Sequence, residues 1–379
     1  MSEYQYYEFR AIDRPLDERE LRTLHSLSTR AEITPTSFVN TYNWGDFKGS
    51  PDALMETCFD AFVYVANWGT RRFALRLPWR LLRSEFLSLC CQGDSLRARE
   101  ASEFVVIDFC TEECPGDWEE GEGWMASLIP LRADLLRGDE RCLYLGWLRS
   151  AQNQELDEDD IEPPVPPSLR SLSGSLEAFV EFMDIDVDLV DVAASESEQP
   201  RTPPTRDELA ARVRTMPLKD KDALLVDAVL NANSQTGAEV LRRFDLSRKV
   251  CPDSKTQSKR RTVGELLEAA RRRSDEKARQ RAKRQAVEQT RQTQEAAKTR
   301  ARYLDQLAER EQATWENVTT LVHTKQPGKY DLAVGLLVDL RDLAARRNEG
   351  VAFQSAVNKL REVHAAKPSF LRRLGEAGL

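Results

Sequence analysis

The sequence predicts an α+β N-terminal domain with a mixed sheet, followed by an all-α region with a long basic helix and a short C-terminal helical bundle. Three observations predict this architecture. Short apolar runs typical of strands recur through the first 110 residues. Apolar residues return at helical spacing after residue 168. No proline occurs at residues 263–322, which favours one long helix there. The 379-residue chain has room for two or three compact units.

Strands and helices are expected in alternation over the first 151 residues. The strands are predicted at residues 4–12, 37–44, 62–68, 72–77 and 104–109. The helices are predicted at residues 17–28, from Pro51, at 124–136 and at 141–151. In residues 72–77, Phe73, Leu75 and Leu77 alternate with polar or small residues, which is the period of a half-buried strand.

A short internal similarity suggests two parallel strands. Phe38-Val39 and Asn43-Trp44-Gly45 are matched 24 residues later by Phe62-Val63 and Asn67-Trp68-Gly69. A strand, a helix and a second strand fit this offset and would make the two strands parallel neighbours, hence the mixed sheet. The tryptophans then have two interpretations: a ligand platform at the sheet end, or a structural corner in which each indole packs.

Composition changes predict the domain boundaries. The acidic and proline-rich residues 152–167 are expected to link an acidic α+β domain, 1–151, to a helical middle region, 168–250, with helices near 206–214, 219–231 and 238–244. Residues 260–322 are predicted to form the long helix, about 90 Å at 1.5 Å per residue, with room for one break. Residues 328–379 are predicted to form a helical hairpin and tail. Its two apolar stripes are Leu332, Leu336, Leu340 and Leu343, then Phe353, Val357, Leu360 and Val363.

Two parts of the chain resemble known families. The opening, Tyr4-Gln5-Tyr6-Tyr7-Glu8-Phe9-Arg10-Ala11-Ile12-Asp13-Arg14-Pro15, resembles the start of a family of uncharacterised bacterial proteins. The last fifty residues are similar to the helical tails behind bacterial SWIM-type zinc-finger domains. That likeness is carried by Tyr330, Leu336-Leu337, Leu340, Phe353, His364, Lys367-Pro368-Ser369 and Leu374. The cysteine and histidine ligands of the finger are missing, so its metal-dependent nucleic-acid binding does not carry over.

Charge is distributed unevenly along the chain. Residues 1–200 carry 39 acidic and 18 basic side chains, whereas residues 241–302 carry 20 basic and 8 acidic ones, within a net charge of −8. Such asymmetry is typical of a charged interaction arm. Six cations of the long helix fall within about 60° on a helical wheel. They are Arg273, Lys277, Arg284, Arg291, Lys298 and Arg302. Nearly opposite lies a small-residue seam of Ala278, Ala282, Ala286 and Ala296.

This basic stripe has three interpretations. In the first interpretation, the alanine seam packs against another helix while the arginines bind the phosphates of a nucleic acid or an acidic protein surface. Alternatively, the stripe docks on the acidic half of its own chain. In the third interpretation the helix is a solvated coiled-coil stalk, supported by pairs such as Glu268 with Arg272. The excess of positive charge costs self-repulsion and so favours an anionic counterpart.

A second basic cluster lies in the acidic domain. It consists of Arg71, Arg72, Arg76, Arg80 and Arg83, accompanied by Trp68 and Trp79. Arginine forks and tryptophan faces could bind a phosphate or carboxylate there. The alternative is simple neutralisation by acidic loops such as Glu112-Glu113 and Glu119-Glu120.

Motifs for metal or cofactor binding are missing from the sequence. With three histidines and no CxxC pair, neither a metal site nor a cofactor is expected. The run 184–188 begins like a calcium loop, but Leu189 stands where that loop needs glycine. A cysteine or serine nucleophile served by a distant histidine remains open.

The sequence also bears on compartment. Seven cysteines, an odd number, lie mostly in apolar stretches, which indicates a reducing compartment. Neither a secretory signal nor a membrane span is recognised, so a cytoplasmic protein without a membrane partner is expected.

The leading hypothesis is therefore a non-enzymatic interaction or adaptor protein whose arginine-rich helix engages an acidic partner or nucleic acid. A second hypothesis is a nucleic-acid-binding accessory factor that uses the basic stripe. A third, an enzyme of unfamiliar type, predicts a deep pocket with converging polar side chains.

Overall fold

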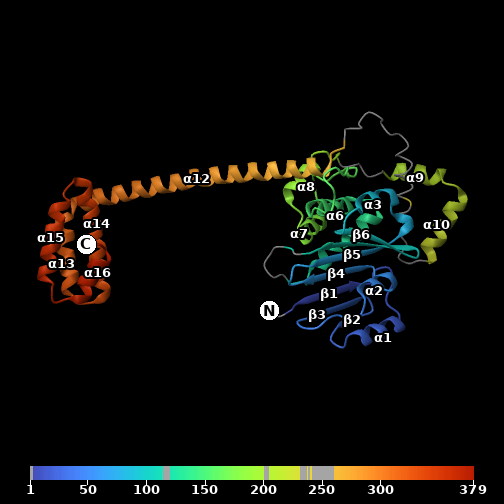
Figure 1. Cartoon of the computed structure of the whole chain (residues 1–379), viewed down its shortest axis with the longest axis horizontal. Helices are drawn as coiled ribbons and strands as arrows, with labels where there is room; N and C mark the ends of the chain where they lie inside the picture. The colour runs from blue at the N-terminus through green and yellow to red at the C-terminus, as the bar shows by residue number, and fades with distance from the viewer. Residues whose placement is uncertain are drawn as a thin grey trace. The chain divides into compact units, whose positions relative to one another are not determined.

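The computed structural model describes residues 3–112, 114, 120–199, 205–230, 237, 240 and 260–379. The chain divides into two compact units, residues 1–276 and 277–379 (Figure 1). The predicted helix at 238–244 lies largely outside the described residues. Among the described helices, none is both long and apolar enough to span a bilayer.

A seven-stranded sheet organises the first unit. Its strands are β1 (Gln5–Arg10), β2 (Glu32–Thr34), β3 (Ser37–Tyr42), β4 (Ala61–Ala66), β5 (Arg71–Pro78), β6 (Leu96–Ala101) and β7 (Phe104–Thr111). The spatial order is β2-β3-β1-β4-β5-β7-β6, and every neighbouring pair is antiparallel. The α+β class is confirmed, but the expectation of a mixed sheet is wrong.

The position of β1 explains why the sheet is not mixed. β1 lies between β3 and β4 and pairs with both, Gln5 standing opposite Tyr42 on one side and Ala66 on the other. The two strands of the internal similarity therefore run in the same direction without pairing. Trp44 and Trp68 follow these strands at the same end of the sheet and remain 65% and 50% exposed. A structural corner would require the indoles to be packed into the core, and neither is.

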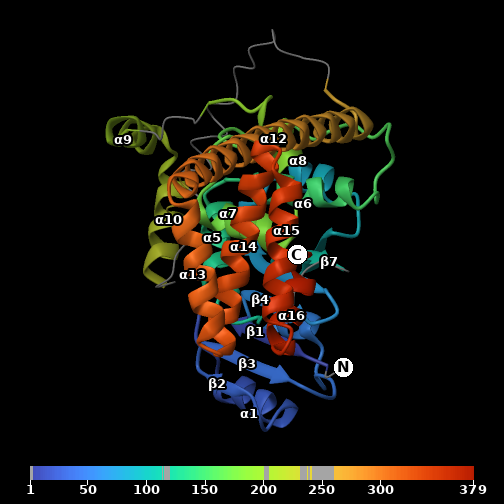
Figure 2. The same cartoon turned by 90° about the vertical axis from the view of Figure 1, so that its left-hand side faces the viewer.

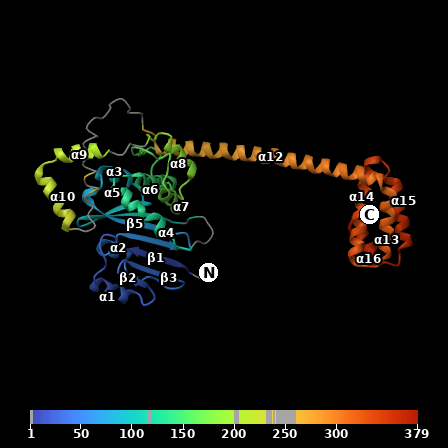
Figure 3. The ribbon, with the colours of Figure 1, turned by 180° about the vertical axis from the view of Figure 1, so that it is seen from behind.

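Helices cover both faces of the sheet (Figures 1 and 3). One face of β5 and β7, with Phe73 and Phe109, shares a core with α4 (Trp124–Leu128), α5 (Pro130–Leu136), α6 (Arg141–Gln152), α7 (Gly174–Phe182) and α8 (Val187–Ala194). The opposite face, with Phe9 and Phe62, packs against α1 (Glu18–Leu27) and α2 (Pro51–Thr57). The expected helix at 124–136 is two helices, because Pro130 starts a new first turn.

Sequence patterning missed four elements. These are β2 and β6, the two edge strands of the sheet, and a 3-10 turn (Trp79–Leu81) and α3 (Ser84–Cys90), whose apolar side chains join the core with α6. β6 has the sequence LRAREA, and only Leu96 is fully buried. An edge strand lacks the apolar alternation of its interior neighbours, since charged residues protect it from pairing with other chains. The unit also includes α9 (Arg206–Thr215) and α10 (Leu218–Leu230).

Residues 152–167, expected as a linker, lie inside the first unit. The buried carboxylate of Glu162 accepts hydrogen bonds from the Tyr144 hydroxyl and from Nε of Arg261, the latter at 2.8 Å. Leu169 and Phe179, which follow this segment, join the same core as α6. Residues 168–194 thus complete the α+β core, and the chain divides after Glu276 rather than at the proline-rich segment.

A long basic helix is confirmed as α12 (Val263–Glu309), shorter than the predicted 260–322. The helix is interrupted at Arg310, and the next helix, α13 (Glu311–His323), packs against α14 in the C-terminal bundle. The remaining helices are α14 (Pro327–Arg347), α15 (Gly350–Val363) and α16 (Pro368–Glu376). Figure 2 shows helices α13–α16 packed side by side in orange to red. They share one core with the end of α12, and this core includes Leu307 of α12 and Val318 of α13.

The buried stripe of α14 differs from the predicted one. Leu332 is 56% exposed, and in α15 Val363 is 74% exposed. The buried side chains of α14 are Tyr330, Ala333, Leu337, Leu340, Leu343 and Ala344. The stripe is displaced because α14 contacts three helices, α13, α15 and α16, so the face it buries is broader than a single leucine row.

Candidate nucleic-acid interface

α12 is capped and buried at its start but exposed on every side along its middle. The helix starts with a reciprocal cap, in which the Thr262 hydroxyl accepts from the Glu265 N–H at 3.2 Å and the Glu265 carboxylate accepts from the Thr262 N–H at 3.0 Å. Its first turns are buried in the first unit through Val263 and Leu266. All side chains at 278–299 are exposed. The predicted alanine seam therefore has no helix against it in the described part of the chain.

The six cations of the predicted stripe have different surroundings. Arg273 ion-pairs with Asp191 at 2.6 Å and with Asp188 at 3.5 Å, both on α8. Carboxylates of the same unit therefore neutralise Arg273. Arg291 pairs within its own helix, with Glu288 at 3.1 Å and Glu295 at 4.0 Å. Lys277 is partly exposed.

The other three stripe residues, Arg284, Lys298 and Arg302, are exposed. They form no ion pair within the described residues. The stripe is therefore not a uniform surface, because carboxylates neutralise it at Arg273 and Arg291.

The densest uncompensated charge lies at residues 279–284, which we call the basic segment. Its four cations are Arg279, Arg281, Lys283 and Arg284. All four are exposed and form no ion pair in the part of the chain that the structure describes. No acidic residue occurs between Glu276 and Glu288. The predicted stripe missed Arg279, Arg281 and Lys283 because all three lie outside its arc on the helical wheel, about 70° to 130° from its centre.

Cations near the end of α12 stabilise the helices of the second unit. Arg300 ion-pairs with Asp339 at 2.6 Å and with Asp342 at 2.7 Å, both on α14. The Tyr303 hydroxyl donates to Asp339 at 2.7 Å. Arg300 is therefore neutralised by α14, whereas its neighbour Arg302 is exposed.

The second predicted cluster is not brought together as one surface. Arg72 and Arg76 lie on the face of β5 toward α2, and Arg72 pairs with Asp52 and Asp108. Arg71 instead donates to the carbonyl oxygens of Glu181 and Phe182, each at 3.2 Å. Arg83 pairs with Glu140.

The remaining members of that cluster are also dispersed. Arg80 is exposed. Trp68 precedes β5 and Trp79 follows it, so the tryptophans lie at opposite ends of the strand. Carboxylates do neutralise several of these arginines, and they come from Asp52 on α2, Asp60, Asp108 on β7 and Glu140. Glu113 and Glu119 of the expected acidic loops lie outside the described residues.

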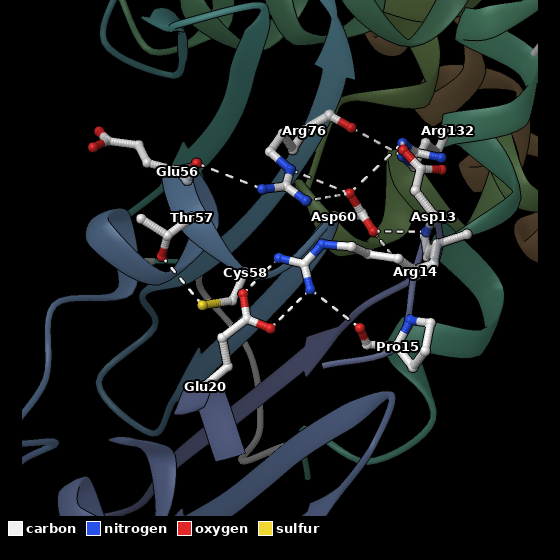
Figure 4. A network of polar contacts seen from close by, with 11 residues as sticks. Asp13, Arg14, Pro15, Glu20, Glu56, Thr57, Cys58, Asp60, Arg76 and Arg132 are labelled. Carbon is white, nitrogen blue, oxygen red and sulfur yellow. Dashed lines mark hydrogen bonds and ion pairs between the residues drawn. The ribbon is translucent and has the colours of Figure 1, made fainter. Parts of the chain in front are cut away.

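Arg76 belongs to a buried network (Figure 4). Its guanidinium pairs with Asp60 at 2.8 Å, and Nε of Arg132 donates to the Arg76 carbonyl at 2.9 Å. Arg132 also pairs with Asp13 at 2.6 Å. These charges satisfy one another inside the unit and offer no open anion site.

A polar cavity of about 720 Å³ lies beside β6 and β7. Arg72, Arg97 and Arg99 line it, and each is paired with a carboxylate. Burial raises the pKa of the Cys110 thiol in its wall to about 11, so this thiol is protonated and weakly nucleophilic at neutral pH. Within the described residues, no cluster of three or more side chains could hold a metal ion.

Comparisons with protein-family models, with curated proteins and with solved structures found no match for this chain. The role of the site is therefore inferred from its geometry. The basic segment combines exposure, high charge density and cations without carboxylate partners in the described chain.

Proposed function

We propose that this protein is a non-enzymatic interaction protein that binds nucleic acid through the basic segment of α12. The observation that carries the proposal is the group of four exposed cations at 279–284 without ion pairs in the described chain. The segment contacts the phosphate backbone and reads no base sequence. Each phosphate that it neutralises releases a counterion, so affinity falls steeply with salt.

The side chains around the segment favour nucleic acid over an acidic protein. Helices that dock on proteins use apolar or aromatic anchors, and these dominate the binding energy. Between Leu267 and Tyr303, the largest apolar side chain of α12 is Val287. Binding to a phosphate backbone needs no such anchor, and arginine forks match phosphate oxygens.

The test is the binding of the full chain to labelled nucleic acids. Fluorescence anisotropy is measured with a duplex DNA and a single-stranded RNA of about 25 nucleotides, at about 50 and 200 mM NaCl. The expected result is binding at low salt that weakens at least tenfold at the higher salt. The triple variant Arg281→Gln, Lys283→Gln, Arg284→Gln should weaken binding and make the log–log salt slope shallower by about 2 to 3.

A matched control distinguishes an effect of the basic segment from an effect of the protein's total positive charge. Lys325→Gln, Lys329→Gln and Lys359→Gln remove the same charge from exposed positions of the second unit. This variant should bind as the wild type does. The proposal is wrong if neither nucleic acid binds at low salt, if the control weakens binding equally, or if poly-glutamate binds while nucleic acid does not.

A further inference from the structure

A buried histidine lies where three helices of the second unit meet. His364 caps the end of α15 and is only 3% exposed. Its Nε2 is buried and has no hydrogen-bond partner. The imidazole lies against His323, the last residue of α13, with ring centroids 5.3 Å apart, and against Phe370 of α16 at 6.1 Å.

The groups that face His364 are aromatic, neutral or basic. α13 contributes His323, α14 contributes Tyr330 through its contact with Phe370, and Lys367 precedes α16. The ammonium of Lys367 donates to the Val322 carbonyl at 2.8 Å, while its N–H donates to the His364 carbonyl at 2.9 Å. In the described chain, no carboxylate is hydrogen-bonded or ion-paired to His364.

We propose that this corner is a pH-sensitive latch, in which uptake of a proton by His364 releases α16 from the helices of the second unit. A proton on Nε2 would place a charge in an apolar site beside Lys367 with no acceptor. When the corner opens, water solvates that charge. The latch is independent of the basic segment, since it lies in a different part of the fold.

The helix dipole of α15 acts in the opposite direction. A cation near a helix C-terminus is normally favoured by the helix dipole. Here Lys367 already occupies the Val322 carbonyl at the end of α13, and the His364 ring is buried. Burial, with smaller contributions from Lys367 and His323, lowers the pKa of His364, so the net effect of the site is against the charge.

The open and closed states of the corner bind a proton with different affinities, and this sets the direction of the pH effect. The open corner binds the proton with an ordinary histidine pKa of about 6.5, and the closed corner binds it less well. The closed state is therefore fully stable above about pH 6.5 and loses stability as the pH falls below that value. The loss ends once the pH passes below the lowered pKa of the closed state.

Hydrogen exchange of the full chain, followed by mass spectrometry at about pH 7.5 and 5.5, tests the latch. After correction for intrinsic exchange rates, peptides covering residues 360–379 should open more at the lower pH, by up to about tenfold. Peptides from β5 and β7 should change little. Equal behaviour of both regions would contradict the proposal.

Variants assign the effect to one imidazole. His364→Phe keeps an aromatic ring that does not titrate and should abolish the pH dependence at the corner. If this variant does not fold, His364→Gln provides a second neutral side chain with the same expectation. His25→Gln alters the exposed histidine of α1 and should retain wild-type behaviour. The proposal fails if either His364 variant keeps the wild-type pH dependence.

Discussion

At the scale of single residues, buried charges in this fold are each held by several partners. Asp60 has no solvent exposure, and its carboxylate accepts from Arg76 at 2.8 Å and from the N–H groups of Ile12 and Asp13 at 2.6 and 2.9 Å. Through Arg132 the same network reaches α5 (Figure 4). One carboxylate thus connects the end of β1, the strand β5 and a covering helix.

We expect Asp60→Asn to lower the free energy of unfolding by about 3 to 5 kcal/mol, because it leaves Arg76 buried without its counter-charge. Urea denaturation followed by circular dichroism measures this change. Asp94→Asn is the control, since the Asp94 pair with Arg97 is exposed on both sides and should contribute at most about 1 kcal/mol. Similar losses in both variants would contradict the assignment of Asp60 as a buried anchor.

At the scale of elements, α6 packs closely on the sheet at a glycine. A Cβ added to Gly146 would lie 2.8 Å from the ring of Phe109 and 3.1 Å from a methyl group of Leu96. Both neighbours are fully buried and have little room to move. The absence of a side chain at this position therefore sets how close the helix comes to β6 and β7.

Gly146→Ala should reduce stability by about 1 to 3 kcal/mol through overpacking, in spite of the better helix propensity of alanine. Gly335→Ala in α14 is the matched control, because no atom lies within 4 Å of the added Cβ. There the same change should raise stability by about 0.5 to 1 kcal/mol. Chemical denaturation of the two variants tests whether the signs are opposite, and the same sign for both would refute the packing argument.

At the scale of the whole molecule, the chain carries separate cores. The cores of the first unit contain residues up to Ala270, and that of the second unit begins at Leu304. A core that is complete within one unit can unfold without disrupting the other. We therefore expect thermal unfolding of the full chain in two steps.

Calorimetry of core variants assigns these steps. Phe179→Ala removes a fully buried ring of the first unit and should lower one transition only. Leu337→Ala does the same in the second unit and should lower the other. Each change should cost about 2 to 5 kcal/mol. If either variant shifts both transitions together, the units are not energetically separate.

Much of the secondary structure could be predicted because its signals are local. Asp17 and Glu20 form the cap of α1, and Pro51 opens α2, as residues close in sequence dictate. The run of strong helix formers after Val263 predicts α12 for the same reason. β6 escaped prediction because its one apolar anchor, Leu96, gives no alternation to recognise.

The candidate site was predicted only in part. Charge counts along the sequence located the cationic stretch of α12, including Arg284, Lys298 and Arg302, which remain exposed. They did not show that Arg273 faces Asp188 and Asp191 of α8, more than 80 residues earlier. The basic segment at 279–284 could be identified only from the structure, which shows which cations of α12 are paired and which are not.

Composition and periodicity were enough to establish the α+β class, the long basic helix and the segregation of charge, because each depends on neighbours along the chain. The order of the strands, the inclusion of residues 152–167 in the first core and the carboxylate that each arginine meets required the folded molecule. A linear pattern shows which side of an element is apolar or charged. What covers that side depends on segments far away in sequence, as with Glu162 and Arg261, 99 residues apart.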